Sequence, residues 1–235
     1  MGEDGRGCVS PLAENFLRTI ASRPDIGSRI LITTRLRPRV LEGHDQKLLQ
    51  HGQEIELTAL SPTDAVNLFH ALGVQGTRAE IETACAPYGY HPLSLRLLAG
   101  LIITDLRQPK DIKVAGRLDV SDDLVQRQHH VLEQAYDSLT PGRQQLLSRL
   151  ACFRSPMNYE SMRVISDAGR DDPAGRLYDD DLRDLLLRGL LHRDDKTNKY
   201  DLHPIVRRYA YDRLVDKSGT HSRLRDYFKA VEAPT

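Results

Sequence analysis

The sequence of 235 residues predicts a mainly α-helical chain with a minor β component. A short apolar run, Ile30-Leu31-Ile32, is typical of a strand buried on both faces of a parallel sheet. Three helical patterns with tight links follow between residues 61 and 103, which predicts a small bundle. Further helical patterns after residue 128 end in a β-hairpin signal at 190–202. Helices followed by a hairpin describe a winged helix.

Composition and charge describe an ordinary globular chain. Hydrophobic residues make up 40%, which is enough for a core. Lys and Arg total 33 and Asp and Glu total 33, and this zero net charge argues against sequence-independent nucleic-acid binding, although a local basic patch stays possible. No apolar run approaches the ~20 residues that span a bilayer, and the first residues are polar rather than a signal peptide. We therefore expect a cytoplasmic protein without membrane contact.

The cysteines point to no special chemistry. Cys8, Cys85 and Cys152 are far apart, odd in number and without CxxC spacing, so neither a disulfide framework nor a zinc site is indicated. Cys85 and Cys152 lie in apolar helical patterns, which predicts buried thiols. Neither a Ser-His-Asp order nor a pair of catalytic carboxylates stands out, so we predict no catalytic residue and no metal ligand.

The first 60 residues predict part of an α/β sheet. A helical stripe over 12–20 should pack on a sheet face, and 54–57 alternates like a second short strand. The run at 30–32 leads into Thr33, Thr34 and Arg35, at the carboxyl end where open α/β sheets bind ligands. A guanidinium there can hold phosphate through two parallel hydrogen bonds. The alternative is a strand that exits into a polar loop.

Capping signals delimit the middle helices. Ser61 followed by Pro62 is a helix start, and Thr77 with Glu80 fits a capping box. Gly89-Tyr90-His91-Pro92 breaks the chain before a strongly apolar helix. Residues 105–127 are polar with few large apolar groups, which predicts a connector and a domain boundary near 127.

Similar signals organise the last hundred residues. Thr140 before Pro141 caps a helix, Asn158 to Asp167 suggests another, and Asp179-Asp180-Asp181 places acids at the positive end of a third. A helix from about Pro204 follows the hairpin. Its arginines could form a DNA-reading face, but nearby aspartates balance them, which favours a solvated helix face; these residues are Arg207, Arg208, Arg213, Asp201, Asp212 and Asp216.

The order of these elements resembles the back half of the nucleotide-binding module of STAND signalling ATPases, in particular the NB-ARC family. Three segments carry the resemblance: Gly27 to Arg35, Gly89 to Leu95, and Leu202-His203-Pro204. It implies a partial α/β P-loop NTPase sheet remnant in 1–60, a three-helix ARC-type bundle with connector in 61–127 and a winged-helix domain in 128–217. Residues 218–235 would be a helix or linker toward a sensor region.

The resemblance also implies a nucleotide site. Arg35 would read the γ-phosphate beside Thr34, which is more simply a cap at the end of the strand. Pro92 would pack near adenine, although the same residue suits a plain helix start. His203 would contact the β-phosphate in the closed, diphosphate-bound state, and the alternative is a neighbour of a helix N-cap without special role.

Departures from the family pattern limit what the resemblance implies about nucleotide binding and hydrolysis. The sequence has no Gly-x-x-x-x-Gly-Lys-Ser/Thr loop and no apolar strand ending in acids that would hold magnesium. Tyr90 stands where the family commonly has a second glycine, and Pro204 replaces an aspartate. We therefore expect a piece of a larger protein whose cofactor is ADP or ATP with Mg²⁺. The chain alone should neither bind nucleotide tightly nor hydrolyse ATP.

The resulting prediction is part of an NB-ARC/STAND switch, in which exchange of ADP for ATP controls opening and self-association. Effector and sensor domains would lie outside this chain. Two alternatives remain: a winged-helix transcriptional regulator that binds DNA, and a truncated module that serves only protein interaction.

Overall fold

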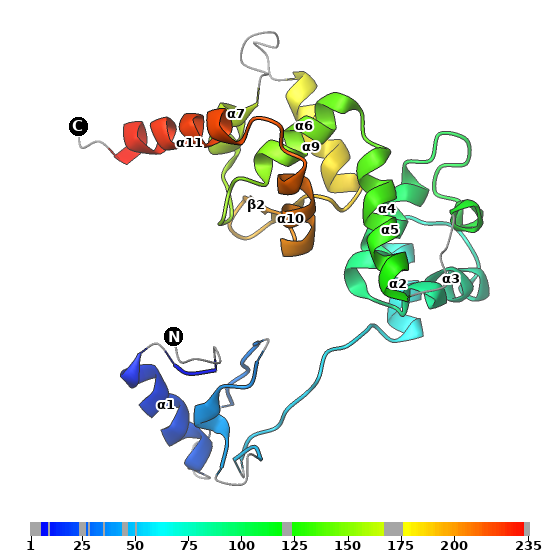
Figure 1. Ribbon diagram of the computed structural model, residues 1–235. Coiled ribbons are helices and arrows are strands. Elements are labelled where there is room, and N and C mark those ends of the chain that lie inside the picture. Colours follow the sequence, from blue (N-terminus) through cyan, green and yellow to red (C-terminus); the bar gives the residue numbers. More distant parts are fainter. Residues whose placement is uncertain are drawn as a thin grey trace. The chain divides into compact units, whose positions relative to one another are not determined.

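The computed structural model (Figure 1) describes residues 6–8, 10–23, 27, 29–34, 36–43, 47–49, 51–118, 124–166 and 176–232. The chain divides into two units, Met1–Leu57 and Thr58–Thr235. Among the described residues, no helix is both long enough and apolar enough to cross a membrane. The described residues are mainly helical with one two-stranded sheet, which confirms the mainly α-helical class with minor β.

The first unit holds the helix α1 (Pro11–Ser22) and the 3₁₀ helix η1 (Arg39–Leu41). The helix begins and ends close to the predicted positions, but none of its residues is buried. Its apolar side chains Leu12 and Phe16 are 81% and 57% exposed. The expected packing of this helix on a sheet face is therefore wrong.

The two strands predicted in this unit are also absent. Residues 29–34 and 51–60 contain no strand, and Leu31 and Leu57 are 89% and 88% exposed. A strand exists only through pairing with a neighbour, and the described part of this unit contains only the isolated bridge between Glu42 and Leu48. The apolar run gives the composition of a strand, but it carries no information on whether a partner strand lies beside it.

The second unit begins with a three-helix part, which we define as residues 62–118. Its elements are α2 (Pro62–Ala71), α3 (Arg78–Cys85), η2 (Ala86–Tyr88), α4 (Pro92–Ile103) and η3 (Ile112–Arg117). Ser61 Oγ accepts a hydrogen bond from Asp64 N at 3.1 Å, and Thr77 forms the predicted capping box. The predicted caps of α2 and α3 are thus confirmed.

The described residues of the predicted connector contain helical structure. It contains η3, and α5 (Leu124–Asp137) begins before its expected end. Ile112 and Val114 are each only 3% exposed, so η3 contributes to the core. Two buried apolar side chains are enough to pack a short polar segment against the core. The low overall fraction of apolar residues in the connector did not indicate this packing.

The rest of the unit surrounds a β-hairpin. The elements are α6 (Pro141–Leu150), α7 (Tyr159–Ile165), α9 (Arg176–Leu187), β1 (His192–Asp194), β2 (Lys199–Asp201), α10 (Pro204–Asp212) and α11 (Lys217–Glu232). The strands pair antiparallel with His192 opposite Asp201, which confirms the predicted hairpin. We call residues 141–214 the hairpin part.

One hydrophobic cluster runs through the second unit, from Ala65 to Leu224. The helix α5 joins the three-helix part to the hairpin part. It packs along α4, and near its end the ring of Tyr136 meets that of Tyr209 of α10 edge-to-face at 5.5 Å. Val131 and Leu132 of α5 are buried. The core is continuous across the predicted boundary near 127, and a division of this unit into two domains stays a prediction.

Candidate functional site

The four predicted nucleotide-contacting residues fall in different places. Arg35 lies outside the described residues. Thr34 belongs to the first unit, whereas Pro92 and His203 belong to the second, at the first turns of α4 and α10.

Thr34 closes a local turn. Its hydroxyl donates to the carbonyl oxygen of Leu36 at 2.7 Å and accepts from Leu36 N at 3.3 Å. Threonine commonly makes this turn with the backbone two residues ahead. Because residues 29–34 contain no strand, this contact closes a loop rather than the expected strand end, and a nucleotide role for Thr34 stays a prediction.

Pro92 begins α4 after a tight turn. Gly89 and Tyr90 both have left-handed backbone, with φ of +59° and +54°. Tyr90 therefore takes the conformation that glycine adopts without strain, although a tyrosine there costs roughly 1–2 kcal/mol. The carbonyl oxygen of Tyr90 accepts from Leu60 N at 3.1 Å, which fixes the segment before α2 against this turn.

The amino end of α4 carries partial positive charge. The side chain of the N-cap residue His91 makes no capping hydrogen bond to its first amides, and the proline ring at the first position is exposed. Uncapped amides and the helix dipole favour an anion at such an end. His91, the preceding residue, contacts Ser94 Oγ through Nδ1 at 3.3 Å.

His203 is the N-cap residue of α10. Its Nδ1 accepts a hydrogen bond from Ile205 N at 3.3 Å, and the residue is exposed. A neutral imidazole that accepts through Nδ1 carries its proton on Nε2. In this tautomer Nε2 is a hydrogen-bond donor.

Arg207 fixes the backbone on which His203 sits. Its guanidinium donates to the carbonyl oxygens of Phe153 at 2.7 Å and Leu202 at 3.2 Å, and it pairs with Asp201. The predicted solvated face is thus wrong for this arginine, because it is partly buried and bonded to backbone. Its partners include a residue 54 positions away, so no local pattern could have indicated this role.

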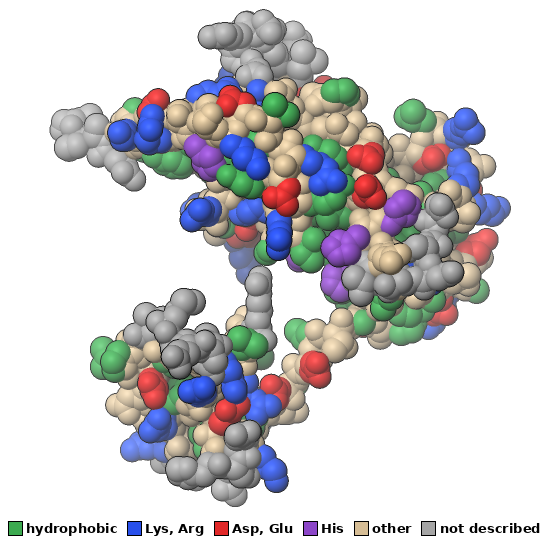
Figure 2. Space-filling model, viewed as in Figure 1, with side chains coloured by type: hydrophobic (Ala, Val, Ile, Leu, Met, Phe, Trp, Pro, Cys, Tyr) green, Lys and Arg blue, Asp and Glu red, His purple; other side chains and the backbone are tan. Residues whose placement is uncertain are grey.

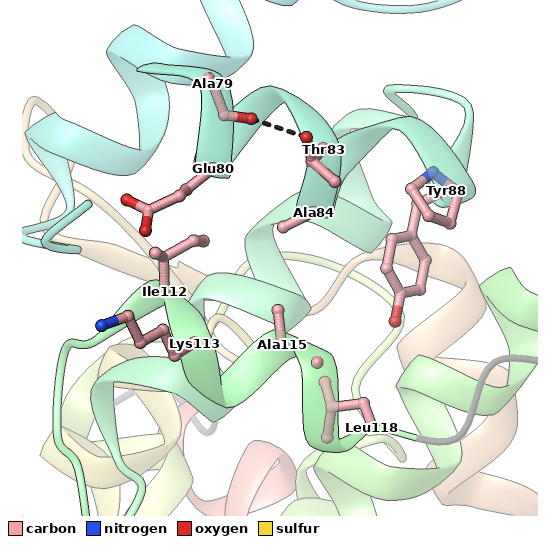
Figure 3. Close-up of a pocket in the computed structure, with 11 residues that line it drawn as sticks. Ala79, Glu80, Thr83, Ala84, Tyr88, Ile112, Lys113, Ala115 and Leu118 are labelled. Atoms are coloured by element: carbon pink, nitrogen blue, oxygen red, sulfur yellow. Dashed lines mark hydrogen bonds between the residues drawn. The ribbon is translucent and has the colours of Figure 1, made fainter. Parts of the chain in front are cut away.

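A cleft of about 540 Å³ opens in the three-helix part, between α3, η2 and η3. Figure 3 shows Glu80 and Lys113 toward one end and Tyr88 toward the other. Most of its lining is apolar, and neither Pro92 nor His203 contributes to it. The cleft therefore suits an apolar group better than a phosphate.

Several acidic and thiol side chains of the described residues lie in structural contacts or in the core. Among the described residues, no cluster of three or more His, Cys, Asp or Glu side chains could hold a metal ion. Asp179 accepts from Tyr159 Oη at 2.6 Å, which raises the pKa of that phenol to about 12. Burial raises the pKa of Cys85 to about 12 and of Cys152 to about 11, so both thiols stay protonated, as the prediction of buried cysteines implies.

Comparison with known proteins gives one structural likeness. No family model matches the chain, and a search of curated proteins found no match. The chain resembles the crystal structure of a Signal Transduction ATPase with Numerous Domains (STAND), the protein PH0952 from Pyrococcus horikoshii with a tetratricopeptide repeat sensor. The TM-score is 0.58 at 21% identity, over 85% of this chain and 25% of that protein. The fold is STAND-like.

Proposed function

We propose that this chain is part of a nucleotide-dependent signalling switch of the STAND class, with ADP or ATP as its ligand. The observation that supports this most is His203: a STAND-like fold holds an exposed histidine as the N-cap residue of α10. Arg35, Thr34 and Pro92 would be the other nucleotide contacts. NB-ARC is the branch of the class whose motifs these residues resemble.

The proposed switch follows from a ligand that contacts two global states differently. A diphosphate held by His203 would favour the closed arrangement, with α9, the hairpin and α10 as its winged helix. Exchange for ATP would remove that contact and permit self-association, and effector and sensor domains would act from outside these residues. The sequence has no phosphate loop, so we propose that the chain alone binds nucleotide weakly and does not hydrolyse it.

DNA reading is less well supported. In a winged helix, the helix before the hairpin enters the major groove. Here that helix is α9, in which Asp179, Asp180, Asp181 and Asp184 outnumber the arginines, so it offers phosphates no net positive charge. Figure 2 shows basic and acidic side chains intermixed on the visible face rather than gathered in a basic stripe.

Calorimetric titration and ligand-detected NMR with Mg-ADP test the proposal. We expect no micromolar binding, but weak binding in the millimolar range that His203→Ala abolishes. His192→Ala is the matched control, because His192 is also exposed and lies on β1 in the same part. Micromolar affinity, or equal binding by His203→Ala and the parent, would contradict the proposal.

A further inference from the structure

The cleft between α3, η2 and η3 has the size of a small-molecule site. Its volume of about 540 Å³ lies within the range of roughly 300–1,000 Å³ that is usual for ligand pockets. Small residues form its two walls: Ala84 of α3 and Ala115 of η3 both line it (Figure 3), and no described atom lies within 4 Å of a Cβ added to Gly116. Ile112 and Val114 are buried, which fixes η3 in place. The cleft is therefore a preformed space.

An aromatic side chain lies at one end of the cleft. Tyr88 of η2 is 5% exposed, and burial raises the pKa of its phenol, which keeps the ring neutral. Arg127 Nη1 of α5 donates to the carbonyl oxygen of Pro87 at 2.9 Å, which holds η2 in place. This end therefore offers a fixed apolar face on which an alkyl chain or a flat ring can pack.

The opposite end carries a carboxylate and an ammonium group. Glu80 Oε2 accepts from Thr77 N and from Thr77 Oγ1, each at 2.8 Å. These bonds, and to a lesser extent the charge of Lys113, lower the pKa of Glu80, so its negative charge is stabilised within the first turn of α3. Lys113 is exposed, and in the described part of the chain no hydrogen bond or ion pair holds its ammonium group. Lys113 can therefore donate hydrogen bonds to an anion at this end.

We propose that the cleft binds a small amphipathic carboxylate, whose apolar body packs between the alanines and Tyr88 and whose carboxylate contacts the ammonium group of Lys113. Medium-chain acyl and aromatic carboxylates share this chemistry. The apolar body supplies most of the affinity, because an exposed ion pair contributes little, whereas the ion pair selects the sign of the ligand's charge. Neither Pro92 nor His203 lines the cleft, so this site goes beyond the proposed nucleotide function and stands or fails separately from it.

Isothermal titration calorimetry of the full chain with two series of ligands tests the proposal. Octanoate, octylamine and octanol share an alkyl body, and phenylpropionate, phenylpropylamine and phenylpropanol share an aromatic one. We expect at least one acid to bind with a dissociation constant below about 1 mM, and about fivefold tighter than its matched amine. The acid that binds more tightly identifies the preferred body. The proposal is overturned if neither acid binds at millimolar concentration, or if acid and amine bind equally.

Lys113→Gln tests the contact with the carboxylate. It should reduce the preference for the acid over the amine by about two- to fivefold and leave the affinity for the alcohol unchanged. Lys110→Gln is the matched control, because Lys110 is also exposed and lies in the same segment but does not line the cleft. That variant should keep the preference of the parent. An undiminished preference in Lys113→Gln would overturn the proposal.

Ala84→Phe fills the cleft and should abolish binding of both acids. Ala71→Phe is its control, because Ala71 is exposed on α2 and lies outside the lining. Circular dichroism checks that both variants keep the helix content of the parent. If Ala84→Phe does not, Ala115→Leu fills the cleft from the other wall and should weaken binding instead. A folded filling variant that binds the acids as tightly as the parent does would overturn the proposal.

Discussion

The substitution Gly100→Ala should change the free energy of unfolding through two effects of opposite sign. In an exposed helix, alanine is favoured over glycine by about 1 kcal/mol. At Gly100 the added Cβ would lie 2.7 Å from the Cα and carbonyl carbon of Arg188. These are backbone atoms that cannot rotate away, and overpacking of this kind costs about 1–3 kcal/mol. The difference between the two effects is a fall of up to about 2 kcal/mol in the free energy of unfolding.

Urea unfolding followed by circular dichroism at the helix band measures this change. Gly142→Ala is the matched control: Gly142 is also helical, in α6, and nothing lies within 4 Å of its added Cβ. That variant should be more stable than the parent by about 0.4–1 kcal/mol. Our reasoning is refuted if Gly100→Ala is as stabilising as Gly142→Ala, since α4 and α9 would then not be in contact.

Three further predictions concern local features. Thr77→Ala removes the capping box of α3 and should lower the free energy of unfolding by about 1 kcal/mol in thermal denaturation; no change would mean that water caps this helix equally well. Arg207→Ala leaves the Phe153 carbonyl group without its donor, so amide hydrogen exchange at 199–203 should accelerate, whereas in Arg208→Ala, which removes an exposed arginine, it should not. Ellman's reagent at pH 8 should titrate one thiol in the folded chain and three in denaturant, because burial raises the pKa of Cys85 to about 12 and of Cys152 to about 11. The folded state favours the protonated form of these thiols, so their contribution to the free energy of unfolding is complete below pH 9 and is lost as the pH rises toward 12. Fast labelling of Cys85 or Cys152 at pH 8 would contradict their burial.

Features set within one helical turn could be predicted from the sequence. The caps at Ser61, Thr77 and Thr140 each need only a hydroxyl and an amide three residues ahead, and all three are present. The hairpin at 192–201 was equally local, because a polar turn and two short runs define it.

Features that depend on distant partners could not be predicted. The run at 30–32 has strand composition but no neighbouring strand in the described part of its unit. Arg96 meets a carbonyl group 90 positions away, and nothing in its own helix indicates this. Of the candidate site, the sequence correctly located the helix starts at Pro92 and His203, whereas their roles toward a nucleotide stay predictions.

The most direct test of the proposed switch compares the His203 imidazole resonances during titrations with Mg-ADP and Mg-ATP. If His203 contacts the β-phosphate in the diphosphate state, ADP should shift these resonances more than ATP does, and those of His192 should stay in place. Equal responses of His203 to the two nucleotides, or no response to either at millimolar concentration, would contradict the account.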